Sequence, residues 1–167
     1  IGAERDQIGF HRIGAALRIL HSLPPRPGIR RVCFAAQARF LEDQLGAPGS
    51  AQAAVRRVAA NAFERLAGRE AMLALCHNDL HHLNILDDGE RLWLVDWEYS
   101  GNNDPTFELG NACQELGYDH DQIGELCAAY FGEASPALLA RMRLQMIMSD
   151  VGWTLWAAIQ ARISTID

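Results

Sequence analysis

The sequence predicts a mainly α-helical fold with one small β-hairpin region in the middle of the chain. Apolar residues make up 49% of the 167 residues, which is enough to bury the core of one domain or one large lobe. Helical spacing of apolar residues and helix-capping residues recur over most of the chain. In the middle, this pattern gives way to short apolar runs around an Asp-Gly turn.

The first part of the chain predicts three helices. Residues 3–22 place apolar side chains and His21 near one helical face, and a following Pro-Pro pair ends the segment. Residues 33–45 form the second predicted helix, which ends at a glycine. The third runs from Ser50, a favourable N-cap, to about Leu66.

Short apolar runs then replace the helical pattern. Residues 72–76 are a strand candidate, and the polar, histidine-rich residues 77–83 predict a loop. Two further apolar runs, 84–86 and 92–95, flank an Asp-Asp-Gly-Glu turn, which is typical of a β-hairpin. Residues 99–105 are rich in Gly and Asn and predict another loop.

Helices resume in the last third of the chain. Their predicted ranges are 106–116, 122–131 and 136–163. Ser135 is the expected N-cap of the last helix, with Pro136 at its first position. Polar residues gather in the loops around the hairpin, and loops on a rigid scaffold commonly carry function.

Composition excludes several classes of function. The formal net charge is -6, with 15 basic and 21 acidic residues, which argues against a general nucleic-acid binder. No apolar run approaches the ~20 residues that span a bilayer. The four cysteines are scattered without a C-x-x-C pair, which predicts buried free thiols and a reducing, cytoplasmic location.

All 15 basic residues are arginines, so chemistry that needs a lysine ammonium cannot be done by this chain alone. The chain starts at Ile1, and its first methionine is Met72. We therefore expect it to be a piece of a longer protein or a processed product.

The most specific motif lies in the loop before the hairpin. His77, Asp79 and Asn84 form an H-x-D-x-x-x-x-N string, and Asp96 follows 12 residues after Asn84, at the end of an apolar strand. Phosphoryl transfer needs a carboxylate to orient the attacking hydroxyl, and hard oxygen ligands to hold Mg²⁺. A hairpin can bring Asn84 and Asp96 to the same edge, facing Asp79.

This string resembles the catalytic segment of the protein-kinase-like superfamily, most closely that of choline/ethanolamine kinases and aminoglycoside phosphotransferases. By this resemblance Asp79 is the catalytic base, and Asn84 and Asp96 are the Mg²⁺ ligands. His77 braces the loop, and ATP is the phosphoryl donor. Asn78 stands where protein kinases carry Arg, a departure that is typical of small-molecule kinases.

Two further acids have supporting roles by the same resemblance. Trp97-Glu98 replaces the Phe-Gly of protein kinases, and Glu98 is expected to support the metal or its waters. Residues 107–111 resemble the family's F-D-I-G-N segment, whose acidic residue caps and braces the catalytic loop. That role falls on Glu108, which is one methylene longer than Asp.

The acceptor site is expected at the end of the chain. Glu115 matches an acid that faces the quaternary ammonium in choline kinases, and Trp153 and Trp156 resemble a Trp pair that lines the choline pocket. A quaternary ammonium has no N–H to donate, so aromatic faces and a carboxylate recognise it. Tyr118 is a candidate third wall. Core packing is the alternative for the two tryptophans.

The resemblance implies the C-terminal lobe of a protein-kinase-like α+β fold. Residues 1–70 are its helical leading segment, 71–105 hold the catalytic loop and metal-binding hairpin, and 106–167 are the helical substrate-binding segment. The N-terminal nucleotide lobe is absent, so the expected partners are ATP, a small amino alcohol and that missing lobe. We expect the fragment alone to be inactive, and expect no nucleic-acid or membrane partner.

Other hypotheses stay open from the residues alone. An aminoglycoside, thiamine or other small-molecule kinase shares the motif, and Glu115, Asp119 and Asp121 offer the acids that several ammonium groups require. A non-catalytic pseudokinase or binding module is the alternative of another class, although the intact acid and amide set argues against it. A zinc site at the loop histidines is disfavoured because no further ligand completes a closed set.

Overall fold

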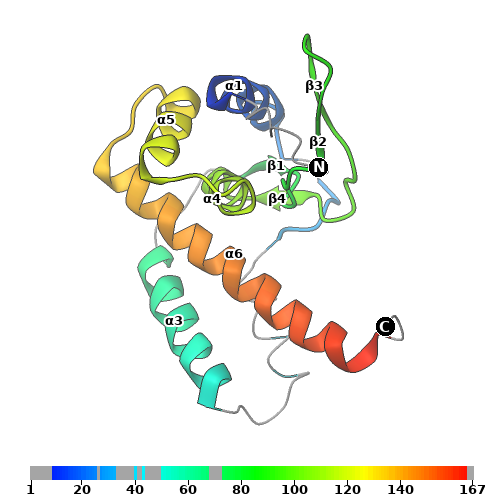
Figure 1. The fold of residues 1–167 in the computed structure, drawn as a ribbon, viewed down its shortest axis with the longest axis vertical. Coiled ribbons are helices and arrows are strands. Elements are labelled where there is room, and N and C mark those ends of the chain that lie inside the picture. The colour runs from blue at the N-terminus through cyan, green and yellow to red at the C-terminus, as the bar shows by residue number, and fades with distance from the viewer. Residues whose placement is uncertain are drawn as a thin grey trace, which may run out of the picture.

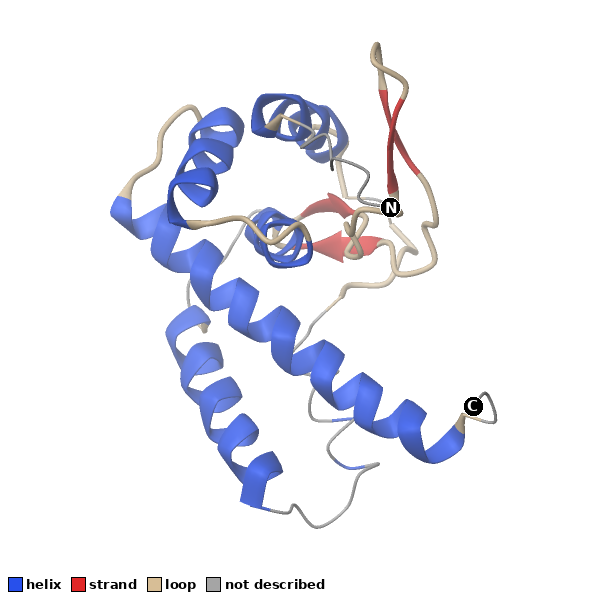
Figure 2. Cartoon of the chain, viewed as in Figure 1, coloured by secondary structure: helices blue, strands red, loops and turns tan. Residues whose placement is uncertain are grey.

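Helices make up most of the described chain, together with two short pairs of antiparallel strands (Figure 1 and Figure 2). The structure is a computed structural model that describes residues 9–25, 27–32, 40, 43, 50–67 and 73–164. Its elements are α1 (Phe10–His21), α3 (Ser50–Leu66), β1 (Ala74–Cys76), β2 (Ile85–Asp87), β3 (Leu92–Leu94), β4 (Gly101–Asn103), α4 (Pro105–Glu115), α5 (His120–Phe131) and α6 (Pro136–Ile163). The predicted fold class is confirmed. Apart from residues 40 and 43, the predicted helix over 33–45 lies outside the described residues, as does the start of the first helix.

The long helix α6 is the element on which most other helices pack. It contacts α4, α3 and α5, and Figure 1 shows α4 and α3 on opposite sides of it. Helix α1 packs on α5 and on β1. The main core is built from Ile13, Leu17, Leu80, Ile85, Leu109, Ala112, Cys113, Ile123, Leu126, Cys127 and Met142. A smaller cluster of Ala59, Val151 and Leu155 joins α3 to α6. Among the described helices, none combines the length and apolarity needed to cross a membrane.

Side-chain caps fix where the last three helices begin. Asp104 accepts a hydrogen bond from the backbone N–H of Thr106 at the start of α4 (2.9 Å). Asp119 and Gln122 form a reciprocal capping box, so α5 begins two residues earlier than predicted. Ser135 caps α6 as predicted. These caps satisfy backbone donors that lack a partner inside their helix.

One predicted loop contains a strand. Within residues 99–105, β4 pairs with β1 in antiparallel register, with Cys76 opposite Gly101 and Ala74 opposite Asn103. The Gly-Asn-Asn sequence has no apolar side chain, so periodicity gave no sign of a buried strand. The pairing with β1 on one side, and hydrogen bonds between Asn102 and the backbone of Arg30 and Val32 on the other, supply its backbone partners. The amide of Asn103 finds its own partner in the interior by donating to Asn78 Oδ1 at 2.8 Å.

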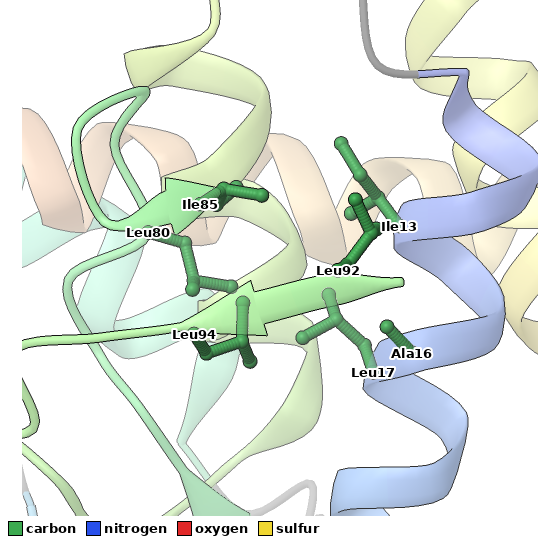
Figure 3. A pocket seen from close by; sticks show the side chains of 7 residues that line it. All are labelled: Ile13, Ala16, Leu17, Leu80, Ile85, Leu92 and Leu94. Carbon is green, nitrogen blue, oxygen red and sulfur yellow. The ribbon is translucent and has the colours of Figure 1, made fainter. Parts of the chain in front are cut away.

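The hairpin of β2 and β3 forms an apolar seam with α1. Figure 3 shows a small apolar pocket where the three elements meet. Its lining is Ile13, Ala16, Leu17, Leu80, Ile85, Leu92 and Leu94. An ion pair between Arg12 and Asp87 adds a polar contact between α1 and the hairpin. Because Leu80 belongs to the loop that precedes the hairpin and is fully buried, the seam also anchors that loop.

Gly110 lies where α4 and α6 cross. A Cβ at this position would come within 2.9 Å of the Met142 carbonyl oxygen and 3.0 Å of the Met146 backbone nitrogen. Both are backbone atoms, which cannot rotate away as a side chain can. We expect Gly110→Ala to lower the free energy of unfolding by about 1–3 kcal/mol, measured by urea denaturation.

Gly124 in α5 is the matched control, because a Cβ there meets no atom within 4 Å. Gly124→Ala is expected to stabilise the protein by up to about 1 kcal/mol through helix propensity. Equal unfolding midpoints for the two variants would contradict the close crossing of α4 and α6.

Candidate active site

The buried carboxylate of Glu108 binds the backbone of the loop that follows β1. Glu108 Oε1 accepts hydrogen bonds from the backbone N–H groups of His77 (2.5 Å) and Asn78 (2.8 Å). Glu108 itself has no exposed surface. A buried carboxylate is strongly unfavourable without partners, whereas hydrogen bonds to a charged acceptor are among the strongest in proteins. Glu108 therefore fixes the backbone just before Asp79.

The second oxygen of Glu108 is bound by α1. His21 Nε2 forms a hydrogen-bonded ion pair with Glu108 Oε2, and the Tyr130 hydroxyl lies 2.7 Å from His21 Nδ1. Sequence reasoning placed His21 near the apolar face of its helix but gave it no role. A polar residue on a buried face was the available signal, because a buried side chain of this kind needs a partner.

Asn78 adopts a left-handed backbone conformation, with φ of 69°. Asn is one of the few residue types that tolerate this region. Its side chain holds the turn in place, since Nδ2 donates to the Tyr99 carbonyl oxygen (3.1 Å) and Oδ1 accepts from Asn103 (2.8 Å). The loop is thus connected to β4 and to the segment that follows the hairpin.

Asp79 and Asn84 are in direct contact. Asn84 Nδ2 donates to the Asp79 backbone oxygen at 2.9 Å and to its carboxylate Oδ2 at 3.2 Å. The two residues are 7% and 4% exposed, respectively. His81 Nε2 lies 3.7 Å from the same carboxylate. Among the described residues, no donor binds the side-chain oxygen Oδ1 of Asn84, so that oxygen is free to bind a ligand.

Asp96 follows Val95, whose backbone is hydrogen-bonded to both ends of the loop of residues 77–84. The Val95 backbone N–H donates to the Asn84 carbonyl oxygen (3.1 Å), and His77 Nε2 donates to the Val95 carbonyl oxygen (2.8 Å). Asp96 itself is exposed and has a left-handed φ of 61°. The structure therefore brings Asp79, Asn84 and the end of the hairpin together.

His77 is buried beneath this junction. Its ring packs against Trp97 with centroids 4.7 Å apart. Because Nε2 donates to a carbonyl oxygen, Nδ1 carries the lone pair, and among the described atoms it has no hydrogen-bond partner. Glu98 is exposed, and its backbone oxygen accepts a hydrogen bond from Arg30 at 3.4 Å.

The exposed carboxylate of Asp96 and the side-chain oxygen Oδ1 of Asn84 are hard oxygen donors, the type that Mg²⁺ prefers. Within the described part of the chain, a separate group of His21, Cys76 and Glu108 has its ligand atoms within 4.8 Å of one another. Burial, and then the charge of Glu108, raise the pKa of the Cys76 thiol, so this thiol stays protonated. Within this group, His21 and Glu108 are paired with each other, and the Cys76 thiol lies 3.7 Å from the Asn103 carbonyl oxygen.

Aromatic side chains gather on the last turns of α6. The rings of Trp153 and Trp156 meet edge-on with centroids 5.8 Å apart, and Tyr99 meets Trp153 in the same way at 5.7 Å. Trp156 is 40% exposed, so it is not a core residue. Tyr118, the predicted third wall, packs edge-on against Phe10 beside the main core, and the tyrosine ring that meets Trp153 is that of Tyr99. The place of Tyr118 in an acceptor site stays a prediction.

Glu115 lies at the end of α4, within electrostatic range of the loop. Partial burial raises its pKa, the nearby charges of Asp79 and Asp150 raise it further, and His81 and His82 lower it. The pKa of the Tyr99 hydroxyl is likewise raised by burial and then by nearby carboxylates, including Asp79. Glu115 and Tyr99 thus both lie within electrostatic range of Asp79 in the loop.

The sequence of this chain is similar to those of choline/ethanolamine kinases. A sequence profile of the family described as Choline/ethanolamine kinase matches residues 50–127. Protein LicA of Haemophilus influenzae is 30% identical over 105 residues, which are 59% of this chain and 39% of that protein. The chain therefore spans less than half the length of this curated relative. Residues 50–127, which the family profile matches, contain the whole string from His77 to Asp96, together with Glu108 and Glu115.

Solved structures give the same result for the fold. A choline/ethanolamine kinase family protein from Mesorhizobium loti has a TM-score of 0.86 and 38% identity, covering 95% of this chain and 55% of that chain. The aminoglycoside phosphotransferase APH(3'')-Id from Streptomyces rimosus, in complex with ADP and streptomycin, has a TM-score of 0.58 and 24% identity, covering 87% and 62%. The predicted resemblance to choline/ethanolamine kinases is confirmed, with aminoglycoside phosphotransferases as more distant neighbours.

Removing the Glu108 carboxylate would test its hold on the loop. In Glu108→Ala, two buried backbone N–H groups lose their acceptor, and each unsatisfied group costs about 1–3 kcal/mol. We expect a lower free energy of unfolding and, in hydrogen-exchange measurements, a selective loss of protection at the His77 and Asn78 amides. Glu125→Ala, at an exposed position of α5, is the control and should leave both amides protected. Unchanged protection in Glu108→Ala would contradict this role.

Proposed function

We propose that this chain is the catalytic and substrate-binding lobe of a small-molecule kinase, which transfers the γ-phosphoryl group of ATP to the hydroxyl of a small, choline-like amino alcohol. The observation that carries the proposal is the direct hydrogen bonding of Asn84 to Asp79, at the point where the end of β3 returns to the same loop. The resemblance to choline/ethanolamine kinases supports it.

Asp79 is the proposed catalytic base. Its carboxylate would accept a hydrogen bond from the acceptor hydroxyl, orient that oxygen towards the phosphorus and take up its proton. The Asn84 amide and the Glu108-bound backbone hold the carboxylate before substrate arrives. Such preorganisation lowers the barrier because little reorganisation remains for the reaction step.

Asn84 and Asp96 would hold Mg²⁺ through their side-chain oxygens. When bound, the ion neutralises charge on the phosphate oxygens of the nucleotide. Glu98 is exposed beside Asp96 and would bind waters of such an ion. His77 acts as a positioning residue, because its hydrogen bond to the Val95 carbonyl oxygen fixes the backbone that leads into Asp96.

Glu115, Trp153 and Trp156 would bind the cationic end of the acceptor. Aromatic faces attract a cation through their quadrupole, and a carboxylate adds direct charge attraction. Tyr99 extends this aromatic surface towards the loop. The nucleotide lobe, with a lysine and a Gly-rich loop, would come from outside this chain, so the 167 residues alone are expected to be inactive. The cytoplasmic location also stays a prediction.

Two alternative functions can be distinguished from the proposed one by experiment. An aminoglycoside, thiamine or other small-molecule kinase would use the same loop with another acceptor. A non-catalytic pseudokinase would bind nucleotide or amine without turnover. A panel of amino alcohols, thiamine and aminoglycosides, assayed with ATP and the full-length protein, separates them. Clear preference for a polyamine sugar over any amino alcohol would overturn the proposed acceptor.

Asp79→Asn in the full-length protein should remove the base while keeping the size of the side chain. We expect kcat to fall by about 10²–10⁴-fold, with nucleotide affinity nearly unchanged. Glu125→Gln, at an exposed position of α5, is the control and should retain full activity. Equal turnover by Asp79→Asn and the parent protein would refute Asp79 as the base.

Trp153→Ala tests the proposed cation site. Losing an aromatic face should raise the KM for a quaternary amino alcohol by about fivefold or more, while the KM for ATP changes little. Steady-state kinetics with each substrate varied in turn gives both values. A drop in stability without any selective change in KM would assign Trp153 to packing alone.

A further inference from the structure

The backbone at Asp96, one of the two proposed metal ligands, adopts a conformation that its surroundings must hold in place. Its φ of 61° lies in the left-handed region, which residues with a Cβ adopt only where neighbouring contacts impose it. On the preceding side, the hydrogen bonds of Val95 to the loop of residues 77–84 supply such contacts. The contacts on the following side therefore also decide where the Asp96 carboxylate lies.

The chain after Asp96 forms a turn whose carbonyl oxygens all have partners. The Ser100 backbone N–H donates to the Trp97 carbonyl oxygen at 3.0 Å and closes the turn. From the side of the catalytic loop, Asn78 Nδ2 donates to the Tyr99 carbonyl oxygen at 3.1 Å. Two carbonyl oxygens of the turn remain, and both face away from that loop towards one other segment of the chain.

These two oxygens accept hydrogen bonds from a single arginine. Arg30 Nη2 donates to the Glu98 carbonyl oxygen and Arg30 Nε to the Ser100 carbonyl oxygen, each at 3.4 Å. A guanidinium carries its donors on a rigid planar fork, so one side chain can bridge two acceptors at a fixed spacing. The turn is thus held between Asn78 on one side and Arg30 on the other.

The backbone of Arg30 is itself fixed beside the turn. Arg31 and Asn102 form a parallel bridge, in which the Asn102 N–H donates to the Arg30 carbonyl oxygen at 3.0 Å and the Val32 N–H donates to the Asn102 carbonyl oxygen at 2.9 Å. At Gly101 a Cβ would lie 2.9 Å from the Arg30 carbonyl oxygen, so only glycine allows this approach. The segment that follows α1 therefore adds a third strand-like edge beside β4 and presents the guanidinium to the turn.

We propose that Arg30 is a positioning residue, whose guanidinium holds the turn after Asp96 and thereby keeps the Asp96 carboxylate in the geometry that binds a divalent cation. The inference rests on the proposed function, because it concerns the metal that Asn84 and Asp96 would hold. Without the guanidinium, water would bind the two carbonyl oxygens, and the backbone at Asp96 would be free to relax towards an ordinary φ.

The sign of the effect separates this role from simple electrostatics. A positive charge near Asp96 and Glu98 repels a cation, so the loss of the charge alone would strengthen metal binding. The loss of the two hydrogen bonds would weaken it. The direction in which metal affinity changes therefore reports which of the two contributions of Arg30 is the larger.

The test measures Mn²⁺ binding to the full-length protein by electron paramagnetic resonance titration, in the presence of a non-hydrolysable ATP analogue. Arg30→Ala is expected to raise the Kd for Mn²⁺ about fivefold. Arg30→Gln lacks the charge but keeps an amide donor, and it should bind Mn²⁺ more tightly than Arg30→Ala.

Arg31→Ala is the matched control, because it removes the same charge from the next residue, whose side chain makes no hydrogen bond to the turn within the described residues. It should leave the Kd for Mn²⁺ within about twofold of the parent value. Hydrogen exchange gives a second readout without metal. The Ser100 amide should lose protection in Arg30→Ala and keep it in Arg31→Ala.

The outcomes separate the inference from the function on which it rests. An Arg30→Ala variant with an unchanged or lower Kd for Mn²⁺, or with the same Kd as Arg31→Ala, would overturn the role of Arg30. A parent protein that binds Mn²⁺ but phosphorylates no amine would overturn the proposed function and leave the result for Arg30 standing. A parent protein that binds no Mn²⁺ would overturn both.

Discussion

The Glu108 carboxylate is the constraint on which the rest of the site depends. A charge with no exposed surface is tolerated only when it is fully paired, and here its partners are His21 from α1 and two backbone N–H groups of the loop. Burial and the Glu108 charge both contribute to raising the pKa of Tyr130, which keeps the hydroxyl protonated beside His21. Helices α1, α4 and α5 are thereby connected to the loop of residues 77–84 through one buried network.

A second carboxylate fixes α6 against the same framework. Asp104 Oδ2 accepts hydrogen bonds from Arg141 Nε and from Gln145 Nε2, each at 3.0 Å, while Oδ1 caps α4 through Thr106. Multiple donors on one buried carboxylate restrict both helices to a single arrangement. Because α6 is one continuous helix of 28 residues, fixing its first half also sets the position of Trp153 on its second half.

Two residues near the site have a left-handed backbone conformation, one in the loop after β1 and one just after β3. Asn78 and Asp96 are the non-glycine residues with positive φ in the described chain, and each lies beside a proposed functional residue or is one. Such conformations cost of order 1–3 kcal/mol and persist only where the surroundings impose them. Hydrogen bonds from Asn103 and to Tyr99 impose the conformation at Asn78. In a structure of short strands, buried amides thus take the place of a large sheet in shaping the site.

Local chemistry let the sequence alone determine the helical fold class, the cap at Ser135, the hairpin around its Asp-Gly turn and the spacing of Asp79, Asn84 and Asp96. Periodicity, capping and turn preferences act over a few residues, so they can be read directly. Tertiary structure decided which distant residues meet. β4 exists because β1 pairs with it, His21 binds a carboxylate 87 residues away, and Tyr99 rather than Tyr118 reaches Trp153. Those contacts depend on how whole helices pack, and packing is a property of shapes that only the folded chain brings together.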